Sequence, residues 1–320
     1  MNLQQETRRG YVISSEMKKV WAVHLRLLEK LFEVCEKYNL RVWAEGGTLL
    51  GTIREKGYIP WDDDIDMAML RPDYDKLQEV AEKEFQKPYF VQTGYTDKYA
   101  NGMMKIRIDG TTAILDKTIY PYRHHGIFID IFPYDAVPND QAELDKMMAQ
   151  AKSIIRPLKA YYIGSYSPFH PQKLMRTLKG AYLVKTRGGK EIYRKYEDLF
   201  RKYKIEDNKM VSCHAWLYNF KRYLRDKHCY DSTLWMPFED IQMPVPSGYH
   251  EILTTQYGDY MKPVKAPSFH GGFQVLDAEK PFEEVIPVLK KQHRWDNWKH
   301  RCNMVLRMIR GKSQTLTLTL

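Results

Sequence analysis

The order of apolar and polar residues predicts an amphipathic helix near the start of the chain. It follows the potential N-caps Ser14 and Ser15, and its apolar positions recur every three or four residues. These positions are Met17, Val20, Trp21, His24, Leu27, Leu28, Leu31, Cys35 and Tyr38. We interpret residues 1–38 as a helical segment that packs on the core and serves as scaffold.

A strand, a turn and a helix are predicted next. Residues 41–45 have the pattern of a short strand, Gly46 and Gly47 that of a tight turn, and residues 48–55 that of a helix start. A second strand follows, in which Ile65, Met67 and Met69 alternate with Asp64, Asp66 and Ala68.

Short strands dominate the rest of this part of the chain. Pro72 opens a predicted helix, and strands are expected at residues 89–92, 103–108, 112–115 and 126–132. Residues 39–138 therefore predict an α+β, or mixed α/β, core with flanking helices, whose sheet is built from elements close together in sequence.

Beyond this core, the chain has three further parts. Residues 139–236 are charged and predicted mostly helical, with a break near Gly164 to Pro171, and we expect a cap that receives an acceptor. Residues 237–272 are predicted to return to the core, with a strand at 238–246 and a short helix near 248–257. Residues 273–320 are predicted to form a basic helix and tail.

The composition predicts a folded protein outside the secretory route. Hydrophobic residues make up 43% of the chain and aromatic residues 13%, which argues against disorder. The longest apolar stretches are far shorter than the roughly 20 residues of a membrane-spanning helix. Residues 1–10 are polar, without the pattern of a secretory signal, so we expect a cytoplasmic location.

The four cysteines are widely scattered and favour reduced, structural thiols. Cys213 with His214, and His228 with Cys229, form a mirrored pair of dipeptides that offers zinc ligands. Their spacing matches none of the common structural-zinc patterns, so zinc is the minor alternative.

A formal charge of +10 suits nucleic acid, an anionic membrane or a polyanionic substrate, and charge alone does not choose among them. The predicted last helix combines many Lys and Arg residues with Trp295 and Trp298. One interpretation is a helix docked on the core with a solvated basic face. The other is peripheral contact with an anionic membrane at the inner face.

Chemistry is concentrated between Glu45 and Leu70. Asp64 and Asp66 alternate with Ile65 along a predicted strand, so both carboxylates are expected on one face. Mg²⁺ (or Mn²⁺) prefers such oxygen ligands, and a third acid is expected from a neighbouring strand. Asp130 is the candidate, because an acid between Ile129 and Ile131 needs a partner.

The diglycine turn complements these acids. Backbone N–H groups of Gly46, Gly47 and Thr48 at a helix start can hold phosphate oxygens, and Gly47 leaves room for the ligand. A Gly-Gly turn or an acid run alone is weak evidence, since acid runs are usually solvated loops or caps. The ordered combination of the two is what makes the signal specific.

The segment from GGTLLGTIR to GYIPWDDDID resembles the signature of the LicD family, which includes bacterial phosphocholine transferases and is related to the fukutin-type enzymes. Similarity extends to GIFIDIFPYD and to MPVPSGYHEILTTQYGDYMKP, and thus covers roughly residues 39–263. The resemblance implies a nucleotidyltransferase-like core sheet with flanking helices and a helical insertion.

Residue by residue, the resemblance implies that Asp64, Asp66 and Asp130 bind the metal and that Asp62 is a supporting acid. Gly46, Gly47 and Thr48 would bind donor phosphates. Further candidates to contact the donor are Arg54, Lys105, Arg107 and His270, for which surface charge or a structural hydrogen bond is the alternative. Aromatic candidates to face a quaternary ammonium, with core packing as the alternative, are Tyr58, Trp61, Tyr120 and Tyr122.

The implied reaction is transfer of a phospho-substituent from a CDP-linked donor, first of all CDP-choline, to a cell-surface glycan or a lipid-linked precursor, with release of CMP. Transfer of another CDP-linked alditol phosphate, or true nucleotidyl transfer, is the alternative within enzymes. A non-catalytic protein that binds a polyanion or nucleic acid is the alternative from another class. Without a stacking motif of the common modules, nucleic acid is not expected as a partner.

Overall fold

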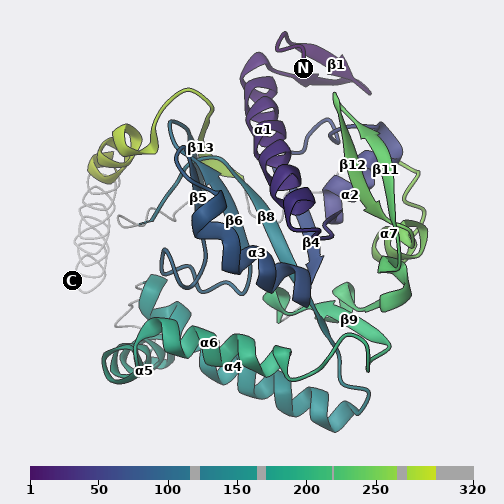
Figure 1. Cartoon of the computed structure of the whole chain (residues 1–320). Helices are drawn as coiled ribbons and strands as arrows, with labels where there is room; N and C mark the ends of the chain where they lie inside the picture. Colours follow the sequence, from purple (N-terminus) through teal and green to yellow (C-terminus); the bar gives the residue numbers. More distant parts are fainter. Residues whose placement is uncertain (116–122, 164–170, 218–219, 265–271, 293–320) are drawn as a thin grey trace, which may run out of the picture.

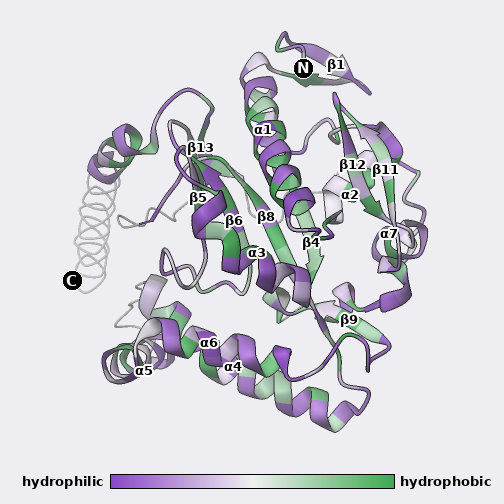
Figure 2. Cartoon of the chain, in the orientation of Figure 1, coloured by the Kyte–Doolittle hydropathy of each residue, from purple (hydrophilic) through white to green (hydrophobic). Residues whose placement is uncertain are grey.

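The computed structural model describes residues 1–115, 123–163, 171–217, 220–264 and 272–292 of the chain (Figure 1). Helices pack around mixed sheets in this part of the chain, which confirms the α+β prediction. Strands of the central sheet are predominantly hydrophobic, whereas the helices alternate hydrophobic and hydrophilic residues (Figure 2).

The first long helix, α1 (Ser15–Lys37), forms as predicted. The Ser14 hydroxyl accepts a hydrogen bond from the Met17 N–H at 3.2 Å and so caps the helix. Its buried stripe packs on the central sheet, and Trp21 stacks on Tyr58 with ring centroids 4.3 Å apart. A small hairpin of β1 (Glu6–Arg8) and β2 (Tyr11–Ile13) precedes it.

Strand β8 (Phe128–Ala136) is the centre of the main sheet, and all nine of its residues are buried. On one side it pairs in parallel with β4 (Asp66–Leu70). The antiparallel β3 (Trp43–Ala44) continues the sheet beyond β4. A fully covered strand usually has a continuous apolar sequence, which is why the two acids within this one, Asp130 and Asp135, stand out.

The other side of β8 pairs with two strands in succession. β6 (Met104–Ile108) pairs antiparallel with its first half and continues to β5 (Tyr89–Gln92). β9 (Met210–Cys213) pairs with its second half and continues to β10 (Arg225–Asp226). β9 and β10 were not predicted, and their place in the sheet is set by their pairing with β8 and with each other.

Two short helices flank β4. α2 (Gly46–Glu55) precedes it, and α3 (Arg71–Glu84) follows it with Pro72 in its first turn, as predicted. α2 packs on β3, β4 and β11 (Thr233–Phe238), while α3 packs on β4 and β8.

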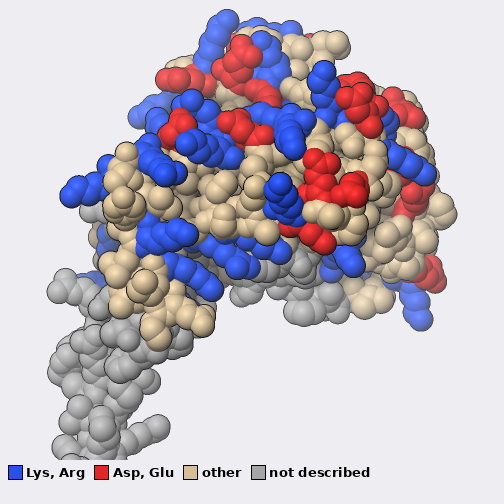
Figure 3. All heavy atoms as spheres, turned by 90° about the horizontal axis from the view of Figure 1, so that it is seen from below, with Lys and Arg blue, Asp and Glu red and all other residues tan. Residues whose placement is uncertain are grey.

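Three helices form the expected cap, namely α4 (Gln141–Ile163), α5 (Pro171–Arg187) and α6 (Gly189–Arg201). They have an apolar cluster of their own, centred on Ile155, Leu158 and Tyr193. The predicted break at Gly164 to Pro171 falls mostly outside the described residues. Seen from below, Lys and Arg predominate on the left of this face, near α5, whose sequence has no acid (Figure 3).

A second hairpin corrects the prediction of one strand at residues 238–246. The structure has β11 (Thr233–Phe238) and β12 (Ile241–Pro246), with Glu239 in the left-handed region at φ 50° between them. The Glu239 carboxylate accepts hydrogen bonds from Arg8 and from the Tyr58 N–H, and these contacts hold the turn. α7 (Tyr249–Tyr257) follows as predicted.

The last described elements lie beside the main sheet. β13 (Phe273–Asp277) pairs antiparallel with β7 (Thr112–Leu115), and residues 282–292 are helical and pack through Phe282 and Ile286 on Ile114. The rest of the predicted basic helix and tail, residues 293–320, lies outside the described residues. No helix in the described ranges has the length and apolarity to cross a membrane.

A buried ion network joins the sheet to the cap. The Arg71 guanidinium donates two hydrogen bonds to Asp135 of β8, at 2.5 and 2.8 Å, and lies 3.7 Å from Glu197 of α6. Burial raises the pKa of Asp135, but Arg71 and His214 outweigh it and hold this pKa below its usual range. The Asp135 carboxylate is therefore ionised, and the Arg71 guanidinium beside it stabilises this buried charge in the folded protein.

We expect Arg71→Met to lower the free energy of unfolding by about 3–5 kcal/mol, because it removes the cation that neutralises the buried Asp135 carboxylate. Urea denaturation measures this loss. The matched control is Lys76→Met, which removes an exposed pair with Glu79 and should cost roughly 0–0.5 kcal/mol. Equal midpoints for the two variants would contradict the assignment.

Candidate functional site

A row of polar side chains crosses four neighbouring strands of the main sheet. Asp66 of β4 is paired in register with Asp130 of β8, and Asp130 is paired with Lys105 of β6. Lys105 is in turn paired with Gln92 of β5. Residues paired in register share a face, so the sheet brings Asp66 and Asp130 side by side, as predicted from the sequence.

Asp62 and Asp64 reach the site from a loop. β4 begins at Asp66, so the prediction that Asp64 lies on the strand is wrong. The Trp21 indole donates a hydrogen bond to the Asp62 carbonyl at 3.0 Å and anchors the loop to α1. One carboxylate oxygen each from Asp62, Asp63 and Asp64 lie within 4.8 Å of one another, and Asp63 was not among the predicted site residues.

The diglycine faces these acids, but as the first residues of α2 rather than a turn before it. Gly46 has φ 54°, which favours glycine. A Cβ on Gly46 would lie 3.4 Å from Asp66 Oδ2, and one on Gly47 would lie 2.7 Å from Asp62 Oδ2. Glycine at these two positions therefore lets the carboxylates of Asp66 and Asp62 lie close against the N-terminus of α2.

Thr48 fixes the spacing between α2 and β4. Its hydroxyl accepts a hydrogen bond from the Asp66 N–H at 2.9 Å, and the Glu45 N–H donates to the Asp66 carbonyl at the same distance. The Asp130 N–H donates to the Ile65 carbonyl, also at 2.9 Å. Hydrogen bonds to neighbouring segments thus fix the backbone of both Asp66 and Asp130.

The Asp66 carboxylate lies among other negative charges. Burial raises the pKa of Asp66 well above its usual range, and the negative charges of Asp64, Asp130 and Asp62 raise it further. Among the described residues, the Asp66 carboxylate forms no hydrogen bond or ion pair. Such an oxygen-only donor set with excess negative charge fits a divalent cation such as Mg²⁺.

Asp130 differs from Asp66 because a cation contacts it. Lys105 Nζ lies 2.5 Å from Asp130 Oδ1, and both side chains are buried. Burial raises the pKa of Asp130, while Lys105 opposes this shift. The same residue, Lys105, also lines a cavity on the side away from Asp66, so it separates an acidic region from a basic one.

This basic cavity has a volume of about 190 Å³. It lies between the sheet and α4, and its lining includes Lys105, Arg107, Arg123, His124, His125, Lys159, Tyr99, Tyr162 and Phe128. Its charged lining residues, within the described part of the chain, are the cations Lys105, Arg107, Arg123 and Lys159, and no Asp or Glu is among them. The cavity therefore favours an anionic group and disfavours a quaternary ammonium.

Two lining cations have no carboxylate as their main partner. Arg107 donates hydrogen bonds to the Gln92 side chain at 2.8 Å and to the Gly126 carbonyl at 2.6 Å, and burial lowers its pKa to about 10. Burial lowers the pKa of Lys159 to about 8, and this amine forms no ion pair or hydrogen bond with a described residue. Lys159 was missed because it looks like any other lysine on a charged helix.

Several further residues near the acids were also missed. Glu45 is buried, its Oε1 lies 3.7 Å from Arg225 Nη2, and burial raises its pKa. The Tyr257 hydroxyl lies 4.0 Å from where a Cβ of Gly46 would be. His24 on α1 is buried, which lowers its pKa to about 4 despite the charges of Asp64 and Asp63. Only Glu45, directly before the diglycine, carried a signal in the sequence.

Some predicted site residues lie elsewhere. The Arg54 guanidinium is 2.7 Å from Glu55 and donates to the Tyr260 carbonyl, and it makes no contact with the acids among the described residues. Tyr58 is buried in its stack on Trp21, so core packing accounts for it. Trp61 contacts Tyr11 edge to face. The remaining predictions, for His270, Tyr120 and Tyr122, fall outside the described residues.

The mirrored Cys and His dipeptides do not come together as one four-ligand group in the described structure. His214 is buried, with its Nδ1 3.2 Å from Asp135 and its ring stacked on Phe200. His228 and Cys229 instead lie beside Glu251.

Comparisons with known proteins show the family to which the chain belongs. The model of the LicD/FKTN/FKRP nucleotidyltransferase domain matches residues 39–173, a range that contains the diglycine, the acids and the lining cations named above. The chain is 30% identical over 246 residues to the lipopolysaccharide cholinephosphotransferase LicD of Haemophilus influenzae, covering 75% of this chain and 89% of that protein. The chain belongs to the LicD family.

Two rickettsial proteins are also similar. An uncharacterized protein of Rickettsia typhi is 32% identical over 149 residues, which is 46% of this chain and 42% of that protein. One of Rickettsia prowazekii is 28% identical over 182 residues, which is 57% of this chain and 61% of that protein.

We expect Asp66→Asn to stabilise the metal-free protein, because it removes a charge that burial and three neighbouring carboxylates disfavour. The melting temperature in EDTA should rise by about 2 °C or more. Mg²⁺ should raise the melting temperature of the wild type but not of this variant. Asp231→Asn, at an exposed loop position, is the control and should change neither value. A lower melting temperature for Asp66→Asn in EDTA would refute the charge argument.

Proposed function

We propose that this protein is a Mg²⁺-dependent transferase that moves phosphocholine from CDP-choline to a hydroxyl group of a glycan, such as lipopolysaccharide or its precursor, and releases CMP. The observation that carries the proposal is the pairing of Asp66 with Asp130 in register beside the diglycine of α2. The similarity to a lipopolysaccharide cholinephosphotransferase supports the transferred group and the acceptor class.

In this proposal, Asp64, Asp66 and Asp130 hold the metal, and the N–H groups of Gly46, Gly47 and Thr48 orient the donor phosphates. A bound divalent cation would neutralise phosphate charge. The acceptor hydroxyl forms a new O–P bond to the choline-bearing phosphorus, and the P–O bond to CMP breaks. Asp62 is our candidate to take the hydroxyl proton, because Asp130 already forms an ion pair with Lys105.

The basic cavity would hold an anionic part of a substrate. Its position beside Lys105, one strand away from Asp130, allows one substrate to contact both regions. Because its lining is cationic, we place the choline ammonium outside it and a phosphate or acidic sugar group inside it.

The rival functions differ in their products and in their metal dependence. A CDP-linked alditol donor would also release CMP, whereas nucleotidyl transfer would release pyrophosphate. A non-catalytic polyanion-binding protein would need no metal, and the unbalanced charge around Asp66 argues against it. A cytoplasmic location and contact of the basic tail with a membrane stay predictions.

We expect purified protein with Mg²⁺ to release CMP from CDP-choline, slowly with water and faster with an acceptor glycan. Asp64→Ala and Asp66→Ala should lower this rate by about 10³-fold or more, since charge neutralisation dominates phosphoryl transfer. Nucleotide chromatography measures CMP, and Asp231→Asn is the control. CDP-ribitol and CTP, tested in parallel, identify the rival donors; near-normal turnover in either alanine variant would overturn the metal assignment.

We expect CMP to bind the cavity more weakly as the pH rises through about 8, because Lys159 loses its proton there. Calorimetry in EDTA between pH 7 and 9 should show a loss of about 10-fold. Lys159→Arg should bind CMP equally at both ends of this range, and Lys159→Gln weakly at both. Lys173→Gln, on exposed α5, should behave as the wild type. If the CMP affinity of the wild type did not change with pH, Lys159 would not belong to the CMP-binding site.

A further inference from the structure

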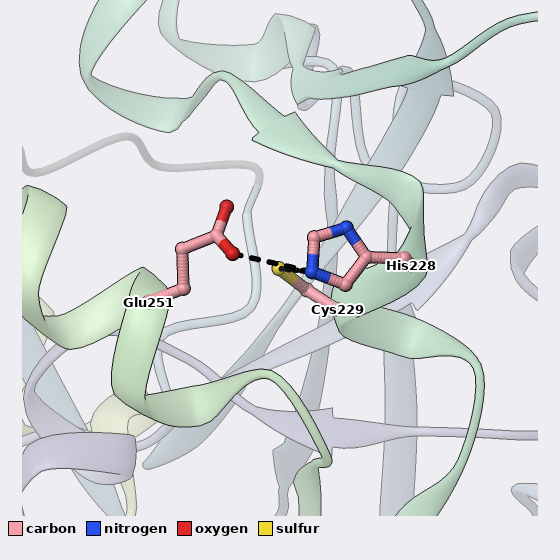
Figure 4. A group of neighbouring side chains, drawn as sticks. All are labelled: His228, Cys229 and Glu251. Carbon is pink, nitrogen blue, oxygen red and sulfur yellow. Dashed lines mark hydrogen bonds and ion pairs between the residues drawn. The ribbon is translucent and has the colours of Figure 1, made fainter.

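A second group of metal-ligating side chains lies away from the acid cluster. His228 and Cys229 belong to the short 3-10 helix η3 (Lys227–Tyr230), and Glu251 lies in the first turn of α7. The three side chains point toward one another (Figure 4). One ligand atom from each lies within 4.8 Å of the others.

We propose that His228, Cys229 and Glu251 form a zinc site, with water as the fourth ligand. Thiolate, imidazole and carboxylate are the ligands that Zn²⁺ uses in proteins. Mg²⁺, by contrast, disfavours sulfur and nitrogen, so the site is chemically distinct from the oxygen-only acid cluster.

The distances between the ligand atoms fit this assignment. Ligand atoms of a tetrahedral zinc site with ordinary bond lengths lie about 3.4 to 3.6 Å apart. His228 Nε2 lies 3.2 Å from Glu251 Oε2 and 4.0 Å from Cys229 Sγ. Both separations lie within about half an ångström of the tetrahedral values, and both involve the same ring nitrogen.

The other ring nitrogen is held by a carboxylate. His228 Nδ1 lies 2.9 Å from Asp226 Oδ1, and the same oxygen accepts a hydrogen bond from the His228 N–H at 3.1 Å. Zinc-binding histidines usually make such a contact through the nitrogen that does not bind the metal, because it fixes the ring and its tautomer. A simple surface ion pair between His228 and Glu251 would not require this contact with Asp226.

Gly248 allows η3 and the start of α7 to lie close together. Its N–H donates to the Cys229 carbonyl at 2.9 Å, and a Cβ at this position would lie 2.7 Å from Cys229 Sγ. The Cys229 side chain is thus buried beneath the start of α7, while His228 and Glu251 are 55% and 54% exposed and give a metal access from solvent.

The two elements joined by this zinc both reach the candidate active site. Arg225, just before η3, lies 3.7 Å from Glu45 and donates a hydrogen bond to Gln256 of α7 at 3.1 Å. Tyr257 at the end of α7 approaches Gly46. Bound zinc would therefore fix the segment that closes the region beside the diglycine, as a structural rather than a reacting metal.

Cobalt substitution tests the site directly. We expect the full-length, metal-stripped protein to bind one Co²⁺ with the near-ultraviolet band of a thiolate ligand and the visible bands of tetrahedral geometry, and Zn²⁺ to displace it. Mg²⁺ should not. Asp66→Asn should keep these bands, which separates this site from the acid cluster and from the proposed reaction.

Substitutions at the exposed ligands His228 and Glu251 test zinc binding without disturbing the buried core. His228→Ala and Glu251→Gln should each lower the Zn²⁺ affinity on the order of 100-fold and remove the rise in melting temperature that Zn²⁺ gives the wild type. His250→Ala, at the neighbouring histidine of α7, is the matched control and should bind as the wild type. Absence of the thiolate band from the wild type, or its persistence in both ligand variants, would overturn the proposal.

Discussion

The site depends on one constraint, the parallel pairing of β4 with β8 in a register that sets Asp66 beside Asp130. Two carboxylates at neighbouring positions of a buried sheet repel each other, and burial adds to the cost of their charge. A sheet shift of one residue would turn either side chain to the opposite face, so this arrangement is held against its own electrostatics. Thr48, Glu45 and Ile65 hold it through hydrogen bonds to the backbone of the pair. Function, rather than stability, accounts for such a pair.

The same row of the sheet also organises the positive charge. Lys105 pairs with Asp130 on one side and lines the basic cavity on the other, so acidic and basic regions meet at a single ion pair. In the proposed function, a nucleotide-linked donor would bring several negative charges, which a cation at the acids and Lys105, Arg107 and Lys159 in the cavity would balance. Lys159 comes from the cap and contributes charge that the sheet alone does not supply. Under this proposal, α4 would take part in substrate binding as well as in packing.

The parts of the chain far apart in sequence are joined to this row by buried polar contacts. Arg71 links the end of β4 to Asp135 of β8 and to Glu197 of the cap, and Trp21 of α1 anchors the loop of Asp62. Arg225 and Tyr257 approach from the last third of the described chain, where the proposed zinc would tie η3 to α7. Each contact limits how far the loop, the helix start and the strand can move apart. The acids and the diglycine therefore face each other because three separate segments are held against one sheet.

The sequence by itself determined the helix at residues 15–37, most strands of the first half, the diglycine, and the acids Asp62, Asp64, Asp66 and Asp130, because each leaves a local pattern of spacing or an acid in an apolar run. It did not determine that Asp64 precedes its strand, that residues 233–246 form a hairpin, or that β9 and β10 join the sheet, since short strands are defined by their partners. Arg54 and Lys159 look alike in sequence as surface cations, yet Arg54 pairs with Glu55, whereas Lys159 lines a cavity and has no counter-ion among the described residues. Only the tertiary structure decides such cases, because burial and the nearest charge are set by residues distant along the chain.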